Sequence, residues 1–243
     1  MAGPEIAAVT PVHPVTPPKK VPKPRNAPER KVRVGRIFAE LDRLFPSATC
    51  ALDHRNAWQL LVATILSAQC TDERVNKVTP GLFQKYPTIK DMANASQDEL
   101  ANDIRSTGFF NNKAKSLRGA AQKILSEFKG NVPKTIEELL TVPGAARKTA
   151  NVVLGTAYGI ASGVVVDTHV QRISQRLDLT RNDEPVKIER DLMKVVPQDK
   201  WALFSHLLIW HGRRRCFARK PDCAHCEVLA LCPRTGVKEP LKQ

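Results

Sequence analysis

Hydrophobic residues recur at helical spacing along most of the chain after residue 30. Val34, Ile37, Leu41 and Leu44 form one apolar stripe that ends before Pro46, as an amphipathic helix does. The same period predicts further helices at about 58–68, 115–128, 135–140, 146–158, 186–196 and 201–211. No segment shows the strict alternation of a half-buried strand. The pattern therefore predicts an all-α fold.

The first 30 residues have a different composition. They hold eight of the 18 prolines and a basic cluster that includes Lys19, Lys20, Lys23 and Arg25. Such a segment disfavours helices and a packed core, so we expect residues 1–30 to form a disordered arm. It has neither the apolar segment of a secretory signal nor the Arg- and Ser-rich pattern of a transit peptide. We expect a cytoplasmic protein at a bacterial nucleoid, and a nuclear or mitochondrial one only in a eukaryotic host.

The net charge favours a polyanionic partner. Lys and Arg number 38 against 24 Asp and Glu, which gives a formal charge of +14. Neutralising phosphates releases counterions and gives affinity for nucleic acid. A generally basic protein, or one attracted to acidic lipid, would have the same charge, so composition alone does not identify the partner. No stretch approaches the roughly 18 apolar residues of a membrane span, and we expect no membrane association.

Residues 139–150, LLTVPGAARKTA, predict a helix, a tight turn and a second helix. Pro143 and Gly144 supply the turn, and the following helix presents free N–H groups and its positive dipole end. Such a helix start can bind a phosphate. Pro-Gly alone is more often an ordinary turn, but Arg147 and Lys148 beside it favour a phosphate site.

Four cysteines near the C-terminus are spaced C-x6-C-x2-C-x5-C, namely Cys216, Cys223, Cys226 and Cys232. Thiolates at such short spacings converge on one metal centre with little chain to order. Paired disulfides are typical of small secreted domains, and this chain has neither the size of such a domain nor a signal peptide. The spacing alone leaves a structural zinc and an iron–sulfur cluster open.

Together these motifs resemble the endonuclease III family of DNA glycosylases. The resemblance covers about residues 34–232 and rests on LSAQCTD at 66–72, VPGAARKTA at 142–150, VDTH at 166–169 and the four cysteines. It implies a six-helix barrel domain with a helix-hairpin-helix motif, and a helical [4Fe–4S] cluster domain formed by both chain ends. The implied division is a barrel domain at 51–162, with the hairpin at about 135–158, and a cluster domain at 31–50 and 163–243.

The resemblance also implies an activity. Such an enzyme removes oxidised pyrimidines from duplex DNA in base-excision repair and cuts the abasic strand by β-elimination through a lysine Schiff base. From residue type and local sequence alone, Lys148 is predicted to be a surface lysine and Asp167 a helix N-cap. The resemblance implies that both residues are catalytic. Arg147, the helix N-terminus and partial desolvation are expected to favour the neutral amine of Lys148. The expected partner is double-stranded DNA with an oxidised pyrimidine or an abasic site, bound by a monomer.

The resemblance further assigns contacts to DNA. Gln69 and Phe109 are expected to fill the gap that an extruded nucleotide leaves, since extrusion costs a few kcal/mol of stacking. The other expected contacts are Asn111, Pro143, Gly144, Ala146, Arg147, Arg215, Arg219 and Lys220. Ala146 stands where the family's hairpin usually has a second glycine. A positive φ there would cost alanine about 1 kcal/mol, whereas a negative φ would cost little.

Two other functions stay open at this point. An adenine-removing mismatch glycosylase of the same superfamily has the same cluster, but that branch lacks a lysine at the position of Lys148 and carries an extra C-terminal domain. A non-catalytic iron–sulfur module would use hairpin and cluster for DNA binding alone. Lys148 and Asp167 argue against the second function, and strand nicking at abasic sites separates it from a lyase.

Overall fold

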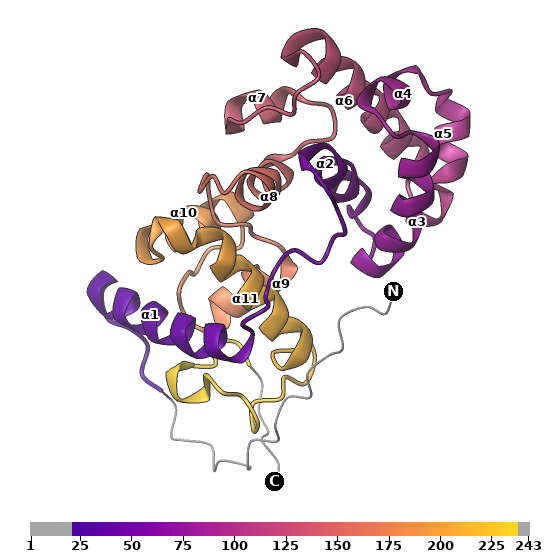
Figure 1. The fold of residues 1–243 in the computed structure, drawn as a ribbon. Helices are drawn as coiled ribbons and strands as arrows, with labels where there is room; N and C mark the ends of the chain where they lie inside the picture. Colours follow the sequence, from indigo (N-terminus) through magenta and orange to yellow (C-terminus); the bar gives the residue numbers. More distant parts are fainter. Residues whose placement is uncertain (1–20, 238–243) are drawn as a thin grey trace.

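The computed structural model describes residues 21–237, and every regular element within that range is helical. The predicted all-α class is confirmed. The α-helices are α1 (Ala27–Leu44), α2 (Ala57–Leu66), α3 (Asp72–Lys85), α4 (Ile89–Asn94), α5 (Gln97–Asp103), α6 (Phe110–Phe128), α7 (Ile136–Thr141), α8 (Arg147–Ala157), α9 (Thr168–Arg176), α10 (Pro185–Val195) and α11 (Trp201–Arg214). Short 3₁₀ turns are η1 (Arg105–Thr107), η2 (Gln198–Lys200) and η3 (Leu229–Leu231). Figure 1 shows two groups of helices, with α2 and α8 where the groups meet.

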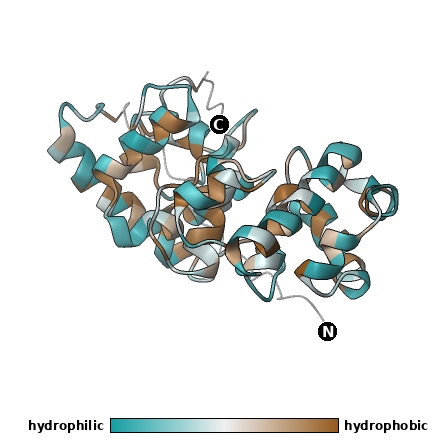
Figure 2. Ribbon diagram, turned by 90° about the horizontal axis from the view of Figure 1, so that it is seen from above, coloured by the Kyte–Doolittle hydropathy of each residue, from teal (hydrophilic) through white to brown (hydrophobic). Residues whose placement is uncertain are grey.

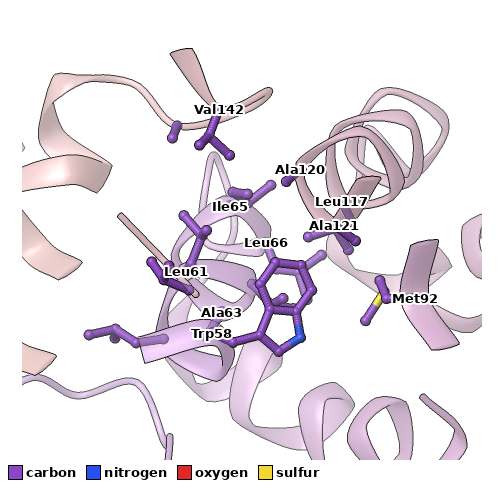
Figure 3. Packing of buried hydrophobic residues seen from close by; sticks show 14 of the residues in the cluster. Trp58, Leu61, Ala63, Ile65, Leu66, Met92, Leu117, Ala120, Ala121 and Val142 are labelled. Carbon is purple, nitrogen blue, oxygen red and sulfur yellow. The ribbon is translucent and has the colours of Figure 1, made fainter. Parts of the chain in front are cut away.

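One hydrophobic core is built around α2. This helix is apolar on all sides, and Trp58 and residues 60–66 are buried, as expected of a helix in the middle of a core. It packs against α3, α6 and α8. In Figure 3, Leu117 and Ala121 of α6 lie close to Leu66, and Val142 lies near Ile65. The α2 core therefore supports the 66–72 segment and the hairpin at the same time.

A second core joins the beginning and the end of the described chain. Val34, Ile37 and Leu41 on α1 are buried in one cluster with residues of α9, α10, α11 and η3, such as Ile173 and Phe204. Hydrophobic residues gather inside both groups of helices, while the outer faces are mainly hydrophilic (Figure 2). No helix between residues 21 and 237 combines the length and the apolar character that crossing a bilayer requires.

The first helix begins earlier than the sequence pattern predicts. Asn26 caps α1, its Oδ1 accepting from the Glu29 N–H at 2.9 Å. Pro28 lies in the first turn, where a helix needs no N–H donor. Residues 27–30 are therefore helical, and their predicted disorder is wrong. The predicted arm at 1–20 lies outside the described residues.

The sequence pattern also missed several helices. It did not predict α3, α4 or α5, it marked only the start of α9 through the Asp167 cap, and it placed the start of α6 at residue 115 instead of Phe110. Pro80 and Gly81 interrupt the pattern inside α3, and α4 and α5 are each under two full turns. Short elements carry too few periodic positions to be read from sequence.

Candidate functional site

The hairpin between α7 and α8 depends on one glycine. Gly144 has φ of +79°, and a Cβ built there would lie 2.8 Å from the Cβ of Ser116. Ala146, in contrast, has φ of −77° and ψ of 170°, an extended conformation open to any residue. The alanine in place of the family's second glycine therefore introduces no strain. Pro143, Gly144 and Ala146 are all exposed, and no side chain caps the α8 N-terminus.

Lys148 and Asp167 line the same cavities between the two groups of helices. Lys148 is an exposed residue in the first turn of α8. Asp167 is the N-cap of α9, and its Oδ1 accepts from the N–H groups of His169 and Val170, both at 2.8 Å. The larger cavity has a volume of about 750 Å³ and is also lined by Gln69. The capping interpretation of Asp167 is confirmed, and the cap fixes its carboxylate at the wall of a cavity that Lys148 also lines.

Arg147 is engaged elsewhere. Its Nε donates to Glu189 Oε2 at 2.6 Å and its Nη2 to Oε1 at 3.2 Å. Glu189 is buried and also accepts from Asn151 at 2.8 Å. These hydrogen bonds raise the pKa of Arg147, so its charge is stabilised by a partner instead of repelling Lys148. Lys148 is exposed, so the expected partial desolvation of its amine is not found.

Gln69 and Phe109 occupy matching positions in two neighbouring loops. Gln69 follows α2 with φ of +53°, and Phe109 precedes α6 with φ of +48°, both in the left-handed region. Phe109 is 62% exposed, whereas Phe110 is half-buried and packs against the α2 core. Asn111 is exposed in the first turn of α6. The structure thus exposes Gln69 and Phe109, as is required of residues that fill the gap left by an extruded nucleotide. These two are called the wedge residues below.

The four C-terminal cysteines line one pocket with Arg176 and His211. Arg176 Nη1 lies 3.1 Å from Cys216 Sγ, the Arg234 N–H donates to Cys232 Sγ at 3.4 Å, and His211 Nε2 lies 3.7 Å from Cys226 Sγ. Burial raises the pKa of Cys232 to about 11 and that of Cys226 further. In the described range, no three His, Cys, Asp or Glu side chains are grouped to hold a single metal ion; the thiols instead surround a space.

The basic residues next to the first of these cysteines, Cys216, are of two kinds. Arg219 and Lys220 are exposed, Lys220 with φ of +50°. Arg215 is only 19% exposed and lies 3.2 Å from Glu227 and 3.7 Å from Asp222. Arg215 therefore holds the loop, while Arg219 and Lys220 face outward.

Sequence reasoning missed further residues of the cavity. Arg213 forms an ion pair with Asp72 at 2.5 Å and so joins α11 to α3 across the cavity rim. His206 lines the smaller cavity with Lys148 and Asp167, and burial lowers its pKa. The LSAQCTD motif pointed to Asp72, but no local pattern marks Arg213 or His206 as its neighbours.

Comparison with known proteins gives consistent matches over most of the chain. Residues 62–198 match the HhH-GPD superfamily of base excision DNA repair proteins. Endonuclease III of Synechocystis sp. is 57% identical over 209 residues, which are 86% of this chain and 95% of that protein. A solved structure of a trapped endonuclease III–DNA covalent intermediate has a TM-score of 0.79 at 42% identity, covering 83% of this chain and 95% of that one. A non-covalent endonuclease III–DNA complex has a TM-score of 0.79 at 43% identity, with 83% and 94% covered.

Proposed function

The chain belongs to the endonuclease III family of the HhH-GPD superfamily, and from that premise we propose that it is a bifunctional DNA glycosylase and abasic-site lyase. It removes oxidised pyrimidines from duplex DNA and then cleaves the strand by β-elimination. One observation carries this proposal within the chain itself: Lys148 and Asp167, from two different helix N-termini, line one cavity.

The neutral amine of Lys148 is the nucleophile. Its Nζ attacks C1′ of the damaged nucleotide, the N-glycosidic bond breaks, and the base leaves with the bonding electrons and takes up a proton. The attached amine then loses a proton, and the C1′–O4′ bond breaks as O4′ takes one up, which opens the sugar ring and leaves a protonated Schiff base at C1′. This cation acidifies the C2′ proton, and its removal expels the 3′ oxygen, which breaks the strand. Lys148 lies in the first turn of α8, at the positive end of that helix.

Asp167 stabilises positive charge that develops on the sugar. Its Oδ1 is committed to the N–H groups of His169 and Val170, which leaves Oδ2 for the substrate. The two backbone donors also hold the carboxyl group in place. The position of this charge at one cavity wall is thus set by the start of α9.

DNA is bound by several parts of the surface. Pro143, Gly144 and Ala146 present the open N-terminus of α8 to a backbone phosphate. Arg219, Lys220 and Asn111 add exposed polar contacts, while Gln69 and Phe109 fill the gap left by the extruded nucleotide. Arg147 and Arg215 support this surface chiefly by their ion pairs with Glu189 and Glu227.

The four cysteines hold a [4Fe–4S] cluster, and the residues present fit that group. The thiols surround a pocket, and donors from Arg176 and the Arg234 backbone already point at two of the sulfurs, as they do at ligating thiolates. Deprotonating buried thiols is unfavourable without a cation, and iron supplies that charge. The cluster, when bound, cross-links the chain segment that carries Lys220; it takes no part in the base-removal step.

The two hydrophobic cores support the predicted division into a barrel domain at 51–162 and a cluster domain at 31–50 and 163–243. The α2 core draws on residues from Leu52 to Val165, and the α1 core on residues from Val34 to Ala48 and from Val164 to Leu231. The enzyme works as a monomer, because Lys148 and Asp167 come from one chain and need no partner copy to meet.

A single assay tests the function. Purified protein is incubated with a duplex that contains thymine glycol, and base release, strand nicking and borohydride-trapped adducts are scored together. We expect all three with the lesion, nicking and trapping with an abasic duplex, and none with undamaged DNA. Binding without nicking would point to a non-catalytic module, and release of mismatched adenine without trapping would point to the adenine-removing branch.

A further inference from the structure

Lys113 on α6 is a buried lysine with two carbonyl partners. Lys113 is only 5% exposed. Its Nζ donates to Leu66 O and to Thr107 O, both at 2.8 Å. Lysine is almost never buried unless its ammonium is paired. Burial lowers the pKa of Lys113, so the two carbonyls have to replace the water that the ammonium has lost.

The two carbonyls lie at the bases of the two predicted wedge loops. Leu66 is the last residue of α2, where helix carbonyls lack an intrahelical partner, and Gln69 follows three residues later. Thr107 ends η1, and Phe109 follows two residues later. One ammonium therefore connects the starts of two loops that are distant in sequence.

Both loop tips need such support. Gln69 and Phe109 each have a positive φ, a conformation that is unfavourable for a residue with a Cβ. Phe109 also exposes most of a large aromatic ring. Residues in such conformations persist only where the surrounding structure holds them. Hydrogen bonds within each loop, such as Cys70 N–H to Ser67 O at 3.1 Å and Thr107 N–H to Ile104 O at 2.9 Å, fix each loop separately, whereas Lys113 relates one loop to the other.

We propose that Lys113 is a positioning residue that clamps the Gln69 and Phe109 loops together, so that both side chains enter the duplex as one preformed wedge. The proposal rests on the proposed glycosylase function. A rigid wedge loses less conformational entropy when it enters the base stack than two independent loops do. The ammonium makes charge-assisted hydrogen bonds, which are about twice as strong as neutral ones. Among the residues that the structure describes, Lys113 is the side chain that donates to both loops.

The test separates extrusion from chemistry. Lys113→Met keeps the length of the side chain and removes its donors, and Lys115→Met is the matched control, because Lys115 is an exposed lysine on the same helix. Three quantities are measured: the single-turnover rate of base release from a thymine-glycol duplex, the lyase rate on single-stranded abasic DNA, and the fluorescence of 2-aminopurine placed opposite the lesion. Single-stranded abasic DNA has no partner strand to unstack, so it needs no wedge.

We expect Lys113→Met to slow base release about tenfold or more, the scale of one lost hydrogen bond to a charged group, and to reduce the 2-aminopurine signal. Its lyase rate on single-stranded abasic DNA should stay within about twofold of wild type, and Lys115→Met should match wild type on all three measurements. In a Gln69→Ala, Phe109→Ala background, Lys113→Met should slow base release no further, because coupled residues are not additive.

Equal losses on duplex and single-stranded substrates would overturn the proposal in favour of a general structural role. An unchanged duplex rate, or a full additional loss in the Gln69→Ala, Phe109→Ala background, would overturn it as well. If Lys113→Met does not fold, Lys113→Gln, which retains a donor for one carbonyl, decides by the same comparison. A wild-type protein that releases no base and cuts no abasic DNA would instead refute the proposed function.

Discussion

Lys148 and Asp167 meet at one cavity because two helices begin there. Lys148 lies in the first turn of α8 and Asp167 is the N-cap of α9, and both line the same two cavities. The lysine is exposed and the carboxylate is held by two backbone N–H groups. The Lys148 side chain is exposed whereas the Asp167 carboxylate is held in place, so we expect the two residues to respond differently to substitution.

Replacing Lys148 by alanine should abolish borohydride-trapped adducts with thymine-glycol and abasic duplexes. Alanine is a good helix former, so α8 and the melting temperature should change little. Lys90→Ala, at an exposed lysine of α4, is the control and should trap like wild type. If Lys148→Ala formed trapped adducts at the wild-type yield, Lys148 would not be the nucleophile.

Replacing Asp167 by asparagine should reduce the single-turnover rate of base release by about 100-fold, the usual scale for one preorganised charged or polar group. Asparagine caps helices about as well as aspartate, so α9 and lesion affinity should be largely kept. Gel shifts measure the affinity for the lesion, and denaturant unfolding measures the stability that the α9 cap provides. Loss of stability together with activity would mean that the cap, and not the charge, was removed.

Gly144→Ala should lower the free energy of unfolding by about 2 kcal/mol or more, because its φ of +79° disfavours a Cβ and the added atom would meet Ser116. DNA affinity should fall as the hairpin shifts. Ala146→Gly is the paired control, at φ of −77°, and should cost at most about 1 kcal/mol through the unfolded chain. Denaturant titrations compare the two; equal effects would contradict the assigned hairpin geometry.

Lys220→Ala should weaken binding to undamaged duplex and reduce the slope of log K against log salt by about 1, as expected for one lost phosphate contact. Both residues carry a Cβ, so the left-handed backbone at Lys220 is equally strained before and after the change. Fluorescence anisotropy at several salt concentrations measures the slope, with Lys90→Ala as reference. A slope identical to wild type would exclude a phosphate contact.

The purified protein should be brown, with a broad visible absorption band and about four irons per chain. Cys226→Ser should lose the iron and with it DNA affinity, because a hydroxyl is a poor ligand for iron–sulfur clusters. Cys70→Ser, outside the cysteine pocket, should keep both. A colourless protein in which metal analysis finds zinc would contradict the iron–sulfur cluster and indicate a single zinc ion instead.

Many features of this molecule depend on residues that are close in sequence, and these features could be predicted for that reason. The periodic apolar positions of α1 and α11 describe one helix face each, and Pro143-Gly144 defines its turn within a few residues. Asp167 followed by Thr168 and His169 is readable as an N-cap because the hydrogen bonds span only two or three residues. The short helices α4 and α5 escaped prediction because so few positions repeat within them.

What the sequence determined by itself was the helical class, the hairpin, and which residues carry reactive groups. Tertiary structure alone decided that Glu189 stabilises Arg147 and that Asp72 pairs with Arg213. It also decided that Lys113 reaches Leu66 and Thr107. Backbone preferences act between near neighbours, whereas these contacts join segments that meet only after α2, α6, α8 and α11 have packed. Their partners are set by the packing of helices, which no local pattern records.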